Sequence, residues 1–320
     1  RMGEERSEGI TKSLESFGFF SGRLKTGTPP RIDKKSINWS ETSISLGDKH
    51  PIPFSYSTNN FKPLNEACHT VYTNQRTHDL IRKNLHLSPM FSGDINGTGP
   101  RYCPSIEDKI DRFKERDSHL LHLEPEWKNS DQIYLNGFST SLPEKTQLKA
   151  IRSIPALKNA KLLRPGYAIE YDFFPPSQVK STLETKSVSG LFFAGQMNGT
   201  SGYEEAAAQG LVCGINAVKK IKNEPPLILT RSSSYIGVMI DDLITKDTLE
   251  PYRMFTSRAE YRLMLRFSNT FERLLEDAAK HKLLQKNKIT TLENALTFKN
   301  KTKAELKRSI TQEEITSNVK

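Results

Sequence analysis

Apolar side chains recur at helical spacing in several parts of the chain. Ile10, Leu14 and Phe17 share one face of a helix that this pattern predicts over residues 9–20. Residues 203–220 are rich in alanine and glycine, which predicts a longer helix that packs closely on a sheet or a flat ligand. Further helices are predicted over residues 76–86, 104–121 and 144–151.

Shorter apolar runs between these segments predict β-strands. Residues 132–135, 166–171 and 190–194 are apolar, β-branched or aromatic and are flanked by turn residues. From residue 33 to 74, apolar positions alternate only briefly among Ser, Thr, Asn and Pro, which is typical of short strands and loops. Strands separated by helices predict an α/β fold, here with a β-rich insertion and a helical carboxy-terminal region.

Charge and composition add an anionic partner to this picture. The 320 residues carry a formal net charge of +10, which favours nucleic acid over a membrane surface, although a general preference for lysine would give the same excess. The 3 cysteines form no C-x-x-C, so neither a disulfide framework nor a zinc site is expected. No run reaches the roughly 18 apolar residues of a membrane-spanning helix. Because the chain begins with Arg1, we expect it to start inside a longer protein.

One cysteine stands between two cations where a helix is expected to begin. In RYCPSIEDK (residues 101–109), Pro104 suits the first helical position, and Ser105 with Asp108 forms an approximate capping pair. Cys103 then lies near the positive end of the helix dipole, an environment that lowers a thiol pKa. The glycine-rich loop before it favours a reactive thiol over the alternative, a half-buried structural cysteine.

A second candidate site combines an apolar strand, a turn and a small-residue helix. Gly195, Gly199 and Gly202 would let backbone N–H groups approach a ligand closely. The start of the following helix would offer a position for an anion. An ordinary strand–turn–helix connection has the same pattern, and the pattern alone does not separate the two interpretations.

Arginines gather between residues 250 and 266. Ser257 and Glu260 form a capping box, which predicts a helix whose arginines share one face. A face of single sign suits the phosphates of RNA. The alternative is a solvated helix in which Glu250 and Glu260 neutralise two of the arginines. The four arginines are Arg253, Arg258, Arg262 and Arg266.

Four long stretches of the chain resemble the MnmG (GidA) family of tRNA-modifying flavoproteins. They are GRLKTGTPPRID (22–33), GDINGTGPRYCPSIEDK (93–109), GLFFAGQMNGTSGYEEAAAQG (190–210) and EPYRMFTSRAEYRLMLR (250–266). The resemblance implies a Rossmann-like FAD-binding α/β core whose amino-terminal part is missing here. We therefore expect residues 1–28 and 105–222 to form a split FAD-binding domain, 29–104 the β-rich insertion, and 223–320 a helical region facing tRNA or a partner.

The resemblance also implies an activity. FAD-dependent enzymes of this family add a carboxymethylaminomethyl or aminomethyl group to C5 of the wobble uridine in tRNA, together with a GTPase of the MnmE type. NADH would reduce the flavin, and methylenetetrahydrofolate would donate the one-carbon unit. A homodimer in the bacterial cytoplasm is expected, with the mitochondrial matrix as the alternative. On the residues alone, a small-molecule flavin or nicotinamide oxidoreductase and a non-catalytic RNA-binding fragment are the rival functions.

Motif matches to the family place the cofactor contacts. Gln196 would contact FAD, with Gly195, Asn198 and Gly199 beside it, and Ser7 is a weaker FAD candidate. The segment of residues 99–113 would contact the nicotinamide dinucleotide, with Gly99, Pro100, Arg101, Tyr102, Ser105 and Glu107 as the candidate residues.

Catalysis would centre on the cysteine segment. Cys103 would attack the uracil ring next to C5, which makes C5 nucleophilic. Asp108 or Glu107 would move protons, and Lys109 would hold an anion or assist the thiol. The arginine-rich stretch would face tRNA.

The chain departs from the family in two ways. The amino-terminal G-x-G-x-x-G that cradles the FAD pyrophosphate is absent, together with a second cysteine. The terminal helical region diverges after about Phe267. We therefore expect an internal fragment that binds FAD poorly on its own.

Overall fold

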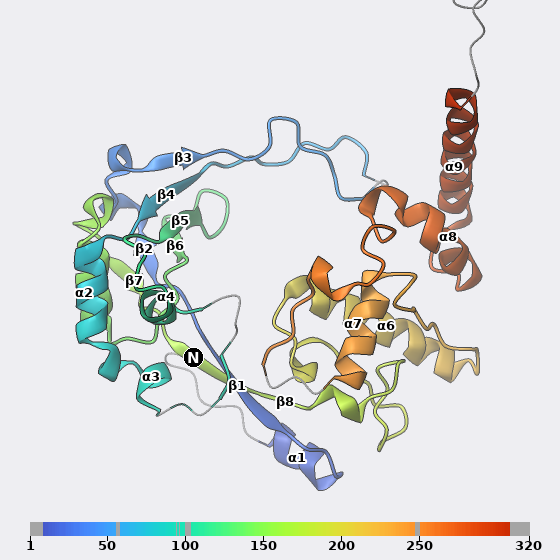
Figure 1. Ribbon diagram of the computed structural model, residues 1–320, viewed down its shortest axis with the longest axis horizontal. Coiled ribbons are helices and arrows are strands. Elements are labelled where there is room, and N and C mark those ends of the chain that lie inside the picture. Colours follow the sequence, from blue (N-terminus) through green and yellow to red (C-terminus); the bar gives the residue numbers. More distant parts are fainter. Residues whose placement is uncertain are drawn as a thin grey trace, which may run out of the picture.

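The computed structural model describes residues 9–55, 58–93, 95, 97–99, 104–246 and 250–307. Figure 1 shows two lobes joined by a two-stranded ribbon. We call residues 28–167 the sheet lobe, and residues 174–269 with residues 10–19 packed against them the turn lobe. Within the described ranges, no helix combines the length and apolar character needed to cross a membrane.

The sheet lobe is built on six strands, and each neighbouring pair is antiparallel. Their order is β3 (Ser43–Ser45), β4 (Cys68–Tyr72), β5 (Leu120–Pro125), β6 (Gln132–Asn136), β2 (Arg31–Asp33) and β7 (Leu162–Arg164). Leu121 and Leu123 of β5 alternate with more exposed residues and are fully buried, as are Ile133 and Leu135 of β6. The strands β5 to β7 thus extend the sheet beyond the expected insertion of residues 29–104.

Helices pack on the same core as the sheet. Ile81, Ile106 and Ile151 come from three of them and are all fully buried. The helices of this lobe are α2 (Gln75–Lys83), α3 (Pro89–Ser92), α4 (Ile106–Arg112) and α5 (Glu144–Arg152).

The ribbon between the lobes pairs β1 (Gly22–Gly27) with β8 (Ala168–Phe173) in antiparallel register. Arg23 on β1 forms ion pairs with Asp172 and Glu170 on β8. Gly22 lies opposite Phe173, and a Cβ at Gly22 would come within 2.4 Å of that ring. The close pairing therefore requires glycine at this position.

The turn lobe surrounds a second apolar core that includes Phe19, Phe174, Phe193 and Leu243. Two helices continue beyond this lobe, α8 (Thr270–Lys280) and α9 (Lys286–Leu306), and neither contains a buried residue. This part also contains α1 (Ile10–Ser16), the 3₁₀ turn η6 (Gly195–Asn198), α6 (Tyr203–Ile221) and α7 (Tyr235–Thr245).

Several elements confirm the sequence-based predictions. The helices over 144–151 and 203–220 are present as α5 and α6, and the strand over 132–135 is present as β6. The helix over 9–20 is shorter than predicted and covers Ile10–Ser16. The capping box of Ser105 and Asp108 is formed as well.

A predicted helix in the sheet lobe and a predicted strand in the turn lobe are wrong. The helix predicted over 104–121 begins after Ser105, its N-cap, and ends at Arg112, so Pro104 lies before the helix. Residues 114–118 are polar and offer no apolar helix face, whereas Leu121 and Leu123 are buried at the two-residue spacing of a strand. The strand predicted over 190–194 is also absent, because Phe192 makes only one isolated bridge, to Glu184.

Candidate functional site

Buried amide and hydroxyl groups hold the glycine turn from inside. Gln209 of α6 is fully buried, and its Oε1 accepts hydrogen bonds from the Gly195 N–H (2.8 Å) and Asn198 Nδ2 (2.9 Å). Its Nε2 donates to Thr200 Oγ1 (2.7 Å), which in turn donates to the Gly195 carbonyl (2.6 Å). These bonds replace the ladder that a regular strand would have supplied.

The outer side of the turn faces solvent. Gln196 is exposed, whereas Asn198 is fully buried and donates to the Phe193 carbonyl at 2.8 Å. Gly195 and Gly199 adopt φ of 70° and 68°, which favours glycine. Of the residues predicted to contact FAD, Gln196 is therefore directed outward, and Asn198 supports the turn from within.

The ribbon links this turn to the loop that leads to the predicted cysteine segment. The Phe174 N–H donates to the Met197 carbonyl at 2.7 Å, and a Cβ at Gly199 would come within 3.1 Å of the Phe173 ring. On the other strand, the Lys25 N–H donates to the Thr98 carbonyl at 3.2 Å, next to Gly99. The two predicted cofactor segments therefore both bind the same ribbon.

Several predicted site residues lie outside the described residues. They are Ser7, Pro100, Arg101, Tyr102 and Cys103. The other two cysteines show unactivated thiols: burial raises the pKa of Cys68, and burial raises the pKa of Cys213 to about 11.

The start of α4 uses its polar residues in local structure. The Asp108 N–H donates to Ser105 Oγ (3.1 Å), and the Ser105 N–H donates to Asp108 Oδ2 (3.2 Å). Lys109 Nζ donates to the Gly137 carbonyl at 2.8 Å. Asp108 and Lys109, predicted to act in catalysis, thus also fix the helix and the adjacent loop.

Glu107, in the first turn of α4, is fully buried. Its Oε1 accepts hydrogen bonds from Ser88 Oγ (3.1 Å), Thr140 Oγ1 (2.9 Å) and the Ser141 N–H (3.0 Å). Burial raises the pKa of this carboxyl, although these hydrogen bonds oppose the shift. Glu107 therefore joins three segments in the interior, a role that its sequence position did not predict.

The arginine-rich stretch pairs with the glycine turn. The Tyr252 N–H donates to the Gly199 carbonyl at 2.7 Å, and the Ser201 N–H donates to the Tyr252 carbonyl at 3.3 Å. Just beyond, the Met254 N–H donates to Glu205 Oε1 at 2.8 Å. The stretch thus runs alongside the predicted flavin turn.

The helix predicted from Ser257 onward is wrong. The structure has a 3₁₀ turn at Thr256–Arg258, followed by further turns. The Glu260 carboxylate binds Arg231, with Oε1 2.6 Å from its Nη2, and is not available as the capping partner of Ser257. The contact between Arg231 and Glu260, which are 29 residues apart, therefore determines the local structure here instead of the capping signal.

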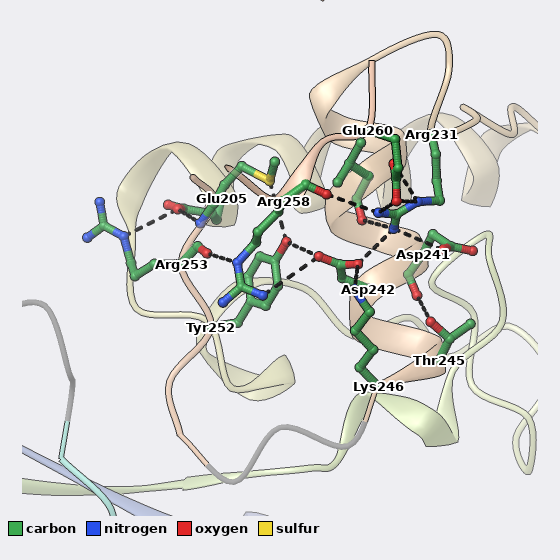
Figure 2. Close-up of polar contacts among 12 residues, drawn as sticks. Glu205, Arg231, Asp241, Asp242, Thr245, Lys246, Tyr252, Arg253, Arg258 and Glu260 are labelled. Atoms are coloured by element: carbon green, nitrogen blue, oxygen red, sulfur yellow. Dashed lines mark hydrogen bonds and ion pairs between the residues drawn. The ribbon is translucent and has the colours of Figure 1, made fainter. Parts of the chain in front are cut away.

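A polar network centred on Asp242 holds this stretch in place (Figure 2). Asp242 is fully buried; its Oδ1 accepts from Arg231 (2.7 Å) and Lys246 (2.6 Å), and its Oδ2 accepts from the Tyr252 hydroxyl (3.1 Å). Burial opposes ionisation, but the bonds from Lys246 and Arg231 outweigh it and hold the pKa of Asp242 below its ordinary value. Sequence analysis missed this residue, whose only signal is an aspartate pair in an otherwise apolar helix.

The predicted single-sign arginine face is wrong. Arg258 stacks on the Tyr252 ring at 4.5 Å and lies 3.8 Å from Asp242 Oδ2, and Arg253 lies 3.3 Å from Glu205 Oε1. Carboxylates therefore accompany two of the arginines, as the alternative interpretation held, but Asp242 and Glu205 supply them instead of Glu250 and Glu260. The other two arginines, Arg262 and Arg266, are exposed.

Comparisons with known proteins agree with the motifs. A family model described as glucose inhibited division protein A (GIDA) matches residues 1–225. The chain is 56% identical over 276 residues to the tRNA uridine 5-carboxymethylaminomethyl modification enzyme MnmG of Borrelia garinii subsp. bavariensis. The aligned residues cover 86% of this chain and 44% of that protein. The chain is 57% identical over 278 residues to the MnmG of Christiangramia forsetii, with the same shares covered.

The solved structure of Aquifex aeolicus GidA, in its form I crystal, resembles this chain with a TM-score of 0.85 and 48% sequence identity. The likeness covers 92% of this chain and 50% of that one. It confirms the expected class, a Rossmann-like α/β core with a helical carboxy-terminal region. The chain spans about half the length of the relatives that it matches.

Proposed function

Because this chain belongs to the glucose inhibited division protein A family, we propose that it supplies part of the FAD site and the tRNA-facing surface of an enzyme that modifies the wobble uridine at C5. The Borrelia and Christiangramia relatives carry a name that states tRNA uridine modification. The observation that carries the proposal is the backbone pairing of Tyr252 with Gly199 and Ser201. This pairing joins the candidate flavin turn directly to the candidate RNA segment.

The residues of the turn fit a flavin. Gln196 is exposed, and Gly202, the N-cap of α6, has no side chain to cap the helix, so backbone N–H groups of its first turn remain available to an acceptor. Asn198, Thr200 and Gln209 hold that surface rigid from below. FAD, when bound, would supply the redox chemistry, while these residues bind and orient it.

The cysteine segment would act on the uracil ring. The Cys103 thiolate would add to the ring carbon next to C5 and leave again once the new group is joined and the C5 proton is lost. Lys109 and Asp108 would support the segment through the hydrogen bonds that fix the start of α4. Residues 99–113 would lie along the nicotinamide dinucleotide, with Glu107 buried beneath them.

The proposal includes the remaining co-reactants and partners of this chemistry. NADH would be the reductant, methylenetetrahydrofolate the one-carbon donor and a GTPase of the MnmE type the partner. The protein would act as a homodimer in the bacterial cytoplasm. Arg262 and Arg266, which are exposed, would attract tRNA.

Cysteine replacement in the full-length protein tests the proposal. Cys103→Ser should abolish uridine modification, measured by mass spectrometry of tRNA nucleosides, and leave flavin absorbance unchanged. Cys68→Ser is the matched control, because this thiol lies on β4 with a raised pKa and should be dispensable. Full modification by Cys103→Ser would contradict the nucleophile role.

A second pair of variants tests the flavin turn. Gln196→Ala should weaken FAD binding in a fluorescence titration, whereas Gln285→Ala, at an exposed position before α9, should not. A full-length protein that lacks flavin absorbance and shows no salt-dependent tRNA binding would contradict the function as a whole.

A further inference from the structure

The Asp242 network fixes the backbone that leads to the two exposed arginines. Arg231, which binds Asp242, also donates through Nη2 to the Arg258 carbonyl (3.1 Å) and binds the Glu260 carboxylate. Asp242 therefore holds residues 258–260 through Arg231, and holds Tyr252 directly.

A small apolar cluster holds the other side of the same segment. Leu265 is 2% exposed and packs with Ala259 and Val238. The Leu265 N–H also donates to the Tyr261 carbonyl at 3.0 Å. Arg262 lies between these two fixed points and is exposed, and it makes no ion pair with the residues described here.

Charges inside the network cancel. Arg231, Lys246 and Arg258 are matched by three carboxylates, those of Asp241, Asp242 and Glu260. A neutral network adds little long-range attraction for a polyanion. The attraction must therefore come from cations outside it.

We propose that Asp242 is a positioning residue for tRNA binding, which fixes Tyr252 and Arg258 so that Arg262 and Arg266 contact the phosphates. The assignment rests on the proposed function and separates the residues that hold the segment in place from the residues that contact tRNA. Arg258 belongs to the scaffold, since its guanidinium covers the Tyr252 ring and its Nε donates to the Arg253 carbonyl at 2.8 Å.

The direction in which Asp242→Asn changes tRNA affinity separates an effect of positioning from an effect of charge. Replacing a carboxylate by an amide makes the protein more positive, so electrostatics alone would tighten its binding to a polyanion. Loss of positioning would instead weaken binding. Asp242→Asn therefore has opposite expected effects under the two explanations.

The experiment measures tRNA affinity of the full-length protein across a salt titration. Asp242→Asn should weaken binding about tenfold and reduce the slope of log affinity against log salt, because Arg262 and Arg266 are no longer held on the phosphates. Asp241→Asn is the matched control: it lies next in sequence, has the same charge, is 44% exposed in its side chain and contacts only Arg231 of the network. It should bind at wild-type affinity or slightly tighter.

Further variants keep the test decisive if Asp242→Asn does not fold. Tyr252→Phe keeps the ring beneath Arg258 and removes only the hydroxyl that binds Asp242, and should weaken binding about threefold with a smaller loss of slope than Asp242→Asn. Arg262→Gln should reduce the slope by about 0.7 to 0.9, the value of one lost phosphate contact, whereas Arg258→Gln should leave the slope unchanged.

Stoichiometric titration separates positioning from a merely structural defect. A structural defect lowers the fraction of protein that binds tRNA, whereas loss of positioning lowers the affinity of the fraction that does. Wild-type affinity in folded Asp242→Asn or Tyr252→Phe, or an equal loss of slope in Arg258→Gln and Arg262→Gln, would overturn the assignment. Absence of salt-dependent tRNA binding in the wild type would instead overturn the proposed function, and the assignment with it.

Discussion

The sheet lobe and the turn lobe differ in whether their buried titratable side chains have a partner of opposite charge. In the described part of the sheet lobe, Glu107, His78 and His119 are buried without an ion-pair partner. In the turn lobe, Asp242 and Glu184 are equally buried but bind cations: Arg231 and Lys246 at Asp242, and Lys180 and Lys220 at Glu184.

The pKa shifts follow this difference. Burial raises the pKa of Glu107, whereas the lysine hydrogen bond and the Gly190 N–H lower the pKa of Glu184 to about 2. Burial likewise lowers the pKa of His119 to about 4. The sheet lobe thus favours neutral groups, which suits a scaffold, and the turn lobe holds paired charges beside the surface proposed to meet flavin and tRNA.

Removing Asp242 should have the largest effect on stability. Asp242→Ala leaves Arg231 and Lys246 without their buried partner, so the free energy of unfolding should fall by about 3 kcal/mol, the lower end for breaking a buried pair. Chemical denaturation at neutral pH measures it. Since the pKa of Asp242 is lowered in the fold, its contribution is present above the unfolded pKa and is lost as the pH falls. An unchanged midpoint would contradict the network.

Mild acid should destabilise the protein because His119 of the sheet lobe is buried in its neutral form. The pKa of His119 is lowered to about 4 by burial and by the charges of His78, Lys109 and Arg116, so the unfolded chain takes up a proton first. Stability should fall by about 2 kcal/mol between pH 7 and pH 5.

The variant His119→Phe isolates this effect. It keeps a ring against His78, whose centroid lies 5.2 Å away, and should lose less stability than the wild type over the same pH range. Equal pH dependence in the two proteins would show that His119 is not buried in its neutral form.

Glu107→Gln should have the smallest effect. The amide oxygen keeps the three hydrogen bonds of Oε1, so stability near pH 4.5 should stay within about 1 kcal/mol of the wild type. Because the pKa of Glu107 is raised, its stabilising contribution is lost as the pH rises. The stability of the variant relative to the wild type should therefore increase toward pH 8. Paired denaturation curves at the two pH values check this, and a relative loss at pH 8 would contradict it.

Local patterns predicted much of the fold. The capping box of Ser105 and Asp108 spans three residues, and α5 and α6 follow apolar periodicity within single segments. These elements need no information from elsewhere in the chain. The glycine turn after residue 194 was also predicted, and Gly195 and Gly199 adopt positive φ there.

Distant contacts decided the elements that were mispredicted. Glu260 carries a valid capping signal, but it binds Arg231, which lies 29 residues earlier. Residues 190–194 are apolar enough for a strand, yet only Glu184 bridges to them among the described residues. Asp242 was not singled out because its partners Arg231 and Tyr252 meet it only in the folded chain.

The central proposal is that the glycine turn and the arginine-rich stretch form one site, in which the turn holds flavin and the stretch faces tRNA. Photocrosslinking of the full-length protein to tRNA that carries 4-thiouridine at the wobble position tests this directly, with the linked peptides mapped by mass spectrometry. Cross-links are expected within residues 99–104, 196–203 or 252–262. Cross-links confined to α8, α9 or the strands of the sheet lobe would contradict it.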